Sequence, residues 1–546
     1  MVELLGIFGL LVVLLRAATL CFQSVAIGGI VFLMVVARKT KLRSDELLFS
    51  CWKLIRWSAL ALALSQMFHV IANSFVLAYS AGIPIKATLG ADFARAGILA
   101  IVAAMAIAAW PSTLRKTVNP WVLLPAGLIL AASVLTSHSA SRMENRAVLM
   151  GLTTLHYLAT ATWIGGLPYL LLSAKRFPDT ERKNQLARNF SRVAQASVAV
   201  LFLAGLGLSW VYVGSLDAMY GTAYGVMLGA KIALFMVLLL LGATNFYIVR
   251  GLGPASRTGA TSLLRFGEAE IGIGLSVILT AASMTAQPPS VDLPQDRVSI
   301  REIAQRFAPR LPRFSSPDVK QISESTNELS KRVEASGEKL PAAFVPGDTR
   351  FVTTTLADIA WSEYNHNCAG LVVALMGILA LLSRSRYFSW AKIWPLAFLL
   401  LAVFLFFRAD PENWPMGPNG FWASCSVAEV TQHRMAILLI ILFAIFQYGV
   451  ETRRVKSPAA ALVFPAVCAL GGVVLLTHTH ALSNVKEELM VELSHVPLAA
   501  LGIVAGWSRW LELRLPEENQ TRKVLAWVWP VCFILVGLIL MDYHES

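Results

Sequence analysis

The sequence predicts an all-α, polytopic integral membrane protein: a helical bundle of about 14 transmembrane helices in two halves, with a small helical extracytoplasmic insert. Of the 546 residues, 56% are hydrophobic and only 14% are charged, whereas a soluble chain carries about 25% charged residues. Apolar runs near the roughly 20 residues of a bilayer crossing recur from end to end. Basic residues gather in alternate loops. This composition excludes a soluble enzyme.

The first half, residues 1–286, contains about eight apolar runs bounded by charged residues, Pro or Gly. They begin near residues 12, 55, 96, 119, 150, 194, 225 and 266. The first run continues to Val36 without a small-residue cleavage site. We therefore expect it to remain as a membrane span and not to be a cleaved signal peptide.

A polar stretch, residues 287–365, separates the two halves and begins with Pro288-Pro289. Within it, Ser316-Pro317-Asp318 has the pattern of a helix start, with Ser as the N-cap and Pro at the first helical position. We expect a small helical domain here. The second half, residues 366–546, contains about six further runs. They begin near residues 366, 390, 432, 459, 495 and 525.

The basic residues indicate the orientation of the chain. Lys and Arg exceed Asp and Glu by 46 − 33 = 13, but the excess lies in short loops between spans and predicts no nucleic-acid partner. Clusters such as Arg38-Lys39 and Arg453-Arg454 fall on one side of the predicted membrane. By the positive-inside rule that side is cytoplasmic, which places both termini on the outer side of the membrane.

The histidines are the strongest functional signal, because all except His69 lie at the predicted outer face. They are His138, His156, His366, His433, His478, His480, His495 and His544. Imidazole is the commonest metal ligand and suits copper, zinc and iron. A single histidine in such a place is more often a hydrogen-bonded helix end, but the shared location of the set favours metal capture.

The strongest local signal for metal binding is one predicted hairpin. Thr477-His478-Thr479-His480 ends one span and His495 begins the next, with Glu487, Glu488 and Glu492 between them. The hairpin that joins His138 to His156 repeats this arrangement. The repeat is either an ancestral duplication or a coincidence between two apolar, Thr-rich helix ends. We expect metal binding at His478, His480 and His495.

Two further features bear on a metal. His69 lies within the second span, and Gln66 and Asn73 share its helical face, which makes this polar stripe a candidate pathway into the bilayer. Cys368 follows His366 by two residues, and thiolate favours Cu(I). The alternatives for Cys368 are a small buried hydrophobic residue or a disulfide with Cys425.

Residues 155–167, Leu-His-Tyr-Leu-Ala-Thr-Ala-Thr-Trp-Ile-Gly-Gly-Leu, resemble the His, Trp, Gly-Gly signature of the bacterial copper-resistance protein D family. Other elements of this resemblance follow in order along residues 1–290. They are Arg16, Thr136-Ser137-His138, Phe190-Ser191-Arg192, Gly205, Trp210, Tyr212, residues 221–225, Lys231, Asn245, Glu270 and Pro288-Pro289. Residues 291–546 carry no motif that can be assigned as firmly.

The resemblance implies inner-membrane copper handling: import or delivery of copper from the periplasm, alongside a small periplasmic copper-binding protein. It implies that His138 and His156 line the outer access of the first half. Lys231 and Glu270 would be polar residues in the membrane core. Each has an alternative structural role: Lys231 could extend to the outer interface, and Glu270 could pair with Arg265.

Three function classes stay open from the residues alone. The first is a copper transporter or homeostasis protein that binds Cu(I) or Cu(II). The second is a membrane redox protein that holds haem b or a copper centre on outer-face histidines. The third is a non-metal membrane scaffold. No GxxxxGK[ST], G-x-S-x-G or HExxH motif is present, so we expect neither an enzyme nor ATP-driven transport.

Overall fold

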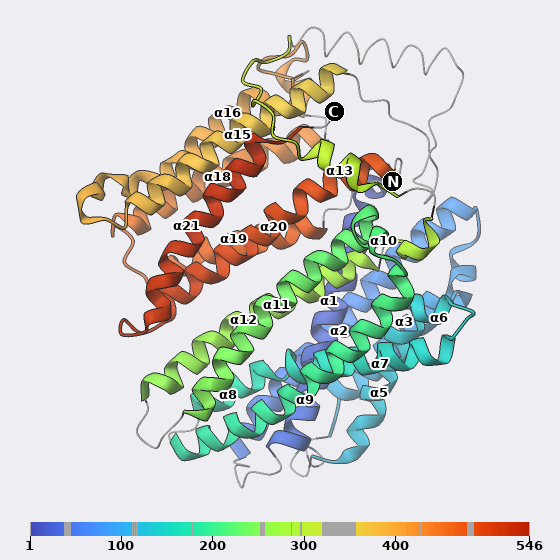
Figure 1. Cartoon of the computed structure of the whole chain (residues 1–546). Helices are drawn as coiled ribbons and strands as arrows, with labels where there is room; N and C mark the ends of the chain where they lie inside the picture. The colour runs from blue at the N-terminus through green and yellow to red at the C-terminus, as the bar shows by residue number, and fades with distance from the viewer. Residues whose placement is uncertain are drawn as a thin grey trace. The chain divides into compact units, whose positions relative to one another are not determined.

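The computed structural model of the chain is helical, apart from one isolated β-bridge between Asn413 and Asn419 in its described part (Figure 1). The residues that the structure describes are 2–37, 45–111, 113, 115, 118–176, 180–251, 257–285, 287–294, 297–318, 356–411, 413–425, 428–477 and 485–544. His478, His480 and most of the helix predicted from Ser316 onward lie outside them.

The chain divides into two compact units, one made mainly of residues 7–297 and the other mainly of residues 298–546. The change of unit at residue 297 falls within the predicted polar insert. The three-part division at residues 286 and 365 stays a prediction, since residues 319–355 are outside the described ranges.

The first unit is built from long helices coloured blue to yellow-green in Figure 1. Helix α3 packs against both α2 and α5, α7 packs on α9, and α11 packs on α12. The helices are α1 (Val2–Val31, followed by a π-helical turn, Phe32–Val36), α2 (Asp45–Ala81), α3 (Asp92–Ala108), α5 (Leu123–Leu135), α6 (His138–Ser141), α7 (Arg146–Trp163), α8 (Leu167–Arg176), α9 (Thr180–Val213), α10 (Leu216–Gly221), α11 (Ala223–Arg250) and α12 (Arg257–Met284).

The second unit is centred on the pairing of α15 with α21 and of α20 with α21. Its core contains Trp394, Phe464 and Trp529, whose rings contact one another with centroids 5.0–5.5 Å apart. The helices are α13 (Ile300–Arg306), α15 (Leu356–Leu382), η5 (Arg386–Leu396), α16 (Ala397–Arg408), α17 (Phe421–Cys425), α18 (Ala428–Glu451), α19 (Val463–Thr477), α20 (Val485–Arg514) and α21 (Gln520–Met541).

The chain is a polytopic membrane protein, as the composition predicted. Within the described residues, nine helical segments are long and apolar enough to cross a membrane, and residues 120–135 and 460–476 form shorter apolar helices. The remaining runs, predicted near residues 96, 266 and 495, coincide with α3, α12 and α20. The number of crossings, about fourteen, stays a prediction.

The Gly165-Gly166 pair lies at the break between α7 and α8, where α1 crosses it in close backbone contact. A Cβ atom on Gly165 would lie 1.9 Å from the carbonyl oxygen of Ser24, and one on Gly28 would lie 2.2 Å from that of Ala161. Only glycine permits helices to approach this closely. The Gly-Gly part of the sequence signature is therefore a packing requirement for α1.

We expect Gly165→Ala to destabilise the first unit by about 1–3 kcal/mol, because the added methyl group overpacks a contact between two backbones. The measurement is the thermal unfolding midpoint of the purified protein in detergent. Gly151→Ala, on α7 with no atom within 4 Å of the added Cβ, is the matched control. Equal midpoints for the two variants would contradict this role.

Candidate functional site

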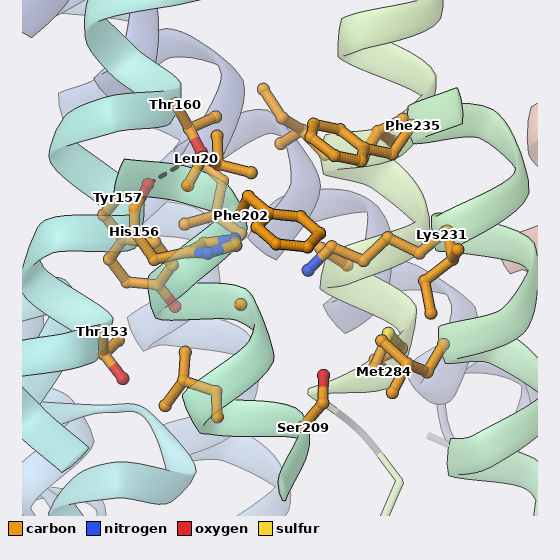
Figure 2. Close-up of a pocket in the computed structure, with 18 of the residues that line it drawn as sticks. Leu20, Thr153, His156, Tyr157, Thr160, Phe202, Ser209, Lys231, Phe235 and Met284 are labelled. Carbon is orange, nitrogen blue, oxygen red and sulfur yellow. Dashed lines mark hydrogen bonds between the residues drawn. The ribbon is translucent and has the colours of Figure 1, made fainter. Parts of the chain in front are cut away.

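A cavity of about 380 Å³ lies inside the first unit. Helices α7, α9, α11 and α12 form its walls, and residues of α1 and α6 complete the lining. The lining is mostly apolar, so the polar groups in it are few and each one is informative. Figure 2 shows His156 and Lys231 on facing walls, with their side-chain nitrogens directed toward one another.

His156 projects from α7 into this cavity. Its Nδ1 is buried and has no hydrogen-bond partner among the described residues. Gly205 on α9 lies opposite, where a Cβ would be 3.9 Å from Nδ1. A methyl group at position 205 would therefore make van der Waals contact with the ring. A buried nitrogen without a partner costs free energy unless a ligand uses it.

His138, the first residue of α6, also lines the cavity. The edges of its ring contact Tyr212 and Tyr224, with centroids 6.3 and 6.4 Å away. Its buried Nε2 has no partner among the residues described. Burial lowers the pKa of His138, and the main chain of Met284 partly opposes this shift. The imidazole is therefore neutral near pH 7, which is the form that binds metals.

A short polar network holds the wall beside His138. The Ser139 hydroxyl lies 2.8 Å from the Tyr212 hydroxyl and 2.5 Å from that of Thr153. On the α1 side, the Arg16 guanidinium donates to the Thr136 hydroxyl at 3.1 Å. Arg16 and Thr136, which carried part of the family resemblance, thus tie α1 to the end of α5.

Lys231 and Met284 add a cation and a thioether to the lining. Lys231 lies in the third turn of α11, and its side chain lines the cavity (Figure 2). Its extension to the outer interface stays a prediction. Met284 is the last residue of α12 and is buried. The sequence analysis did not select Met284; a search for thioethers at the predicted outer helix ends would have included it.

Glu270 is buried in α12, and its side chain is not part of the cavity lining. Its Oε1 accepts a hydrogen bond of 2.7 Å from Asn245 Nδ2 on α11. The predicted alternative, a pair between Glu270 and Arg265, is wrong, because Arg265 forms its ion pair with Glu268 at 2.5 Å. One helical turn separates Arg265 from Glu268, so this pair forms within α12.

The polar side chains of the α2 stripe lie outside this cavity, and most of them form hydrogen bonds. Gln66 is buried and accepts a hydrogen bond from the Thr19 hydroxyl at 3.2 Å, and Asn73 donates to the carbonyl of His69 at 2.8 Å. The Nδ1 of His69 is buried without a partner among the described residues. A pathway along Gln66, His69 and Asn73 stays a prediction.

In the second unit, two of the predicted histidines lie together. The rings of His366 on α15 and His495 on α20 are 6.3 Å apart between centroids and nearly perpendicular. His366 also stacks on Tyr543 at 4.0 Å. Its Nδ1 lies 2.8 Å from the carbonyl oxygen of Ser362. Since the carbonyl accepts, Nδ1 carries the proton and the lone pair of the ring is on Nε2.

His433 and Cys368 are further predicted residues of this unit that the structure describes. His433 Nδ1 lies 2.7 Å from the Asp410 carboxylate. Cys368 is partly buried, and both it and Cys425 are free thiols, so the disulfide considered between them is not formed. His478 and His480 fall outside the described ranges. Within those ranges, no group of three or more His, Cys, Asp or Glu side chains is arranged to hold a metal ion.

Comparison with known proteins shows that part of the first unit is similar to a known family. Residues 184–284, from α9 to the end of α12, match the family described as Copper resistance protein D. "Copper transport protein CutJ" of Bacillus subtilis (strain 168) is 35% identical over 163 residues, which are 29% of this chain and 29% of that protein. No solved structure matches. The cavity-lining segments of α9, α11 and α12 therefore lie in the part of the chain that is similar to the copper resistance protein D family.

Proposed function

We propose that this chain takes up copper from the periplasmic side of a bacterial inner membrane, and so contributes to copper homeostasis or resistance. The observation that carries the proposal is the cavity of the first unit. Its lining includes His138 and His156, and each imidazole has one buried nitrogen without a hydrogen-bond partner among the described residues. Three of its helices lie in the region that matches Copper resistance protein D.

The chemistry of the lining fits copper as a passing substrate. Imidazole suits copper among other metals and thioether favours Cu(I), and His138, His156 and Met284 would be the residues that hold it. The ammonium of Lys231 lies on the facing wall and repels a cation (Figure 2). Such repulsion keeps the bound state weak enough for the ion to leave, which conduction requires.

The second unit supports a role in capturing copper before transport. Two rings on opposite sides of one metal ion, with nitrogen–metal bonds of about 2.0 Å, have centroids about 6 Å apart, and His366 and His495 are 6.3 Å apart. The hydrogen bond from His366 to the Ser362 carbonyl is the kind that orients a metal-binding imidazole. A small periplasmic copper-binding protein would be the donor.

We expect His138→Ala combined with His156→Ala to weaken Cu(I) binding by the purified protein at least about tenfold, because both imidazole ligands of the cavity are lost. Affinity is measured by competition with a colorimetric Cu(I) chelator. His69→Ala, which removes another buried imidazole that does not line the cavity, is the control. A double variant that binds as tightly as the wild type would refute the cavity as the copper site.

We expect the triple variant His478→Ala, His480→Ala, His495→Ala to lower the copper bound per purified protein without changing the folded yield. Elemental mass spectrometry gives the metal content, and the elution profile of the protein gives the yield. Unaltered copper would exclude this hairpin as a site. Iron in place of copper in the wild type would support the haem b alternative instead.

A further inference from the structure

Glu270 has an unusual environment for a carboxyl group. It is 3% exposed, and it lies within α12 among apolar helices. No ion pair among the described residues includes it; the nearest cation on its own helix, Arg265, is paired with Glu268. A buried carboxylate without a positive partner is costly in an apolar environment. In membrane proteins such residues mark ion pathways and proton relays.

The partners of Glu270 come from two neighbouring helices and are both neutral. Asn245 on α11 donates to Oε1 at 2.7 Å. The indole of Trp163 on α7 lies beside the carboxyl group, since a Cβ atom on Gly242 would be 3.7 Å from the indole and 4.0 Å from Oε1. The Oδ1 of Asn245 is buried and has no partner within the described part of the chain. Carboxylate and amide oxygens are thus gathered with no cation to neutralise them.

The other elements packed on this part of α12 supply no charge to Glu270. Gly242 on α11 lies beside both Glu270 and Trp163, and α8 packs on α12 through Leu171 against Gly267. The titratable groups of the neighbouring cavity belong to its lining, which Glu270 does not join. They are His138, His156, Tyr157, Tyr212, Tyr224 and Lys231.

Trp163 connects this group to the cavity. It is buried, lines the cavity and packs edge to face on Phe235, another lining residue, with ring centroids 6.3 Å apart. The same indole lies beside Glu270. A change of charge on Glu270 therefore acts directly on a residue of the cavity wall. Oxygen ligands suit hard cations and protons better than Cu(I), so copper is not the natural occupant of the Glu270 site.

We propose that Glu270 is a proton-binding residue that couples copper movement to the proton gradient, with Asn245 positioning it and Trp163 linking it to the cavity. This rests on the proposed function. A proton from hydronium bonds to one carboxylate oxygen, whose lone pair forms the O–H bond and leaves a water molecule; release to water reverses the step. The charged carboxylate holds the Trp163 indole more strongly than the neutral acid does. Protonation of Glu270 thereby changes the position of Trp163 in the cavity wall.

The test uses the full-length protein in liposomes that contain a pH-sensitive dye, with Cu(I) uptake and proton flux measured together under an imposed pH gradient. We expect a protonophore to slow Cu(I) uptake by the wild-type protein at least about fivefold, because coupling between two linked sites is typically fivefold or more. Glu270→Gln, which cannot exchange a proton, should abolish both the copper-dependent proton flux and the protonophore effect. Glu270→Asp should restore part of both.

Glu268→Gln is the matched control, since it removes a carboxylate two residues away on the same helix that is already ion-paired, and it should behave as the wild type. If Glu270→Gln does not fold, Trp163→Phe carries the test: it keeps a ring but loses the N–H group, and should reduce the protonophore effect.

The inference would be overturned if folded Glu270→Gln kept the proton flux and the protonophore sensitivity of the wild type. The same result in Trp163→Phe would overturn it where that variant carries the test. The proposed copper uptake would stand in either case. Wild-type liposomes that take up no copper would instead overturn the proposed function, and the inference with it. Chelator competition in detergent separates the two failures, because Glu270→Gln should still bind copper in the cavity.

Discussion

The arrangement of this protein depends on the need to satisfy polar groups inside an apolar bundle. A lipid environment offers no water to a polar side chain, so its partner must come from the chain itself. Arg16 meets this need through the hydroxyl of Thr136 and the carbonyl of Ser133, and Gln66 through Thr19. The exceptions are informative. They include His138 and His156, whose buried nitrogens have no partner among the described residues and lie in the same cavity, where a ligand would complete them.

Close backbone packing brings these groups to one place. Because Gly28 and Gly165 allow α1 to lie directly against the end of α7, Gln23 and Ser24 of α1 reach the cavity lining beside Trp163. Trp163 then lies between two chemically different groups. One is the imidazole and thioether lining, suited to a soft metal ion. The other is the oxygen-rich pair of Glu270 and Asn245, suited to a proton.

In the second unit, the ion-pair network and the histidine pair lie at different positions along the same helices. Glu512 pairs with Arg384 and Arg509 and accepts a hydrogen bond from the indole of Trp529, which joins the C-terminal ends of α15 and α20 to α21. His366, His495 and Tyr543 lie nearer the opposite ends of the same three helices. The ion network therefore holds the helices together without using the groups proposed to capture copper.

The sequence by itself determined the helical membrane class, the positions of the apolar helices and the concentration of histidines at predicted outer helix ends. These properties follow from local composition and from the length of apolar runs. Only the tertiary structure decided which groups meet. It placed Met284 in the same cavity lining as His138 and His156, and it placed Glu270 beside Asn245 and Trp163. Such partners lie on different helices or different faces, and their contacts depend on how helices distant in sequence pack, which no local pattern encodes.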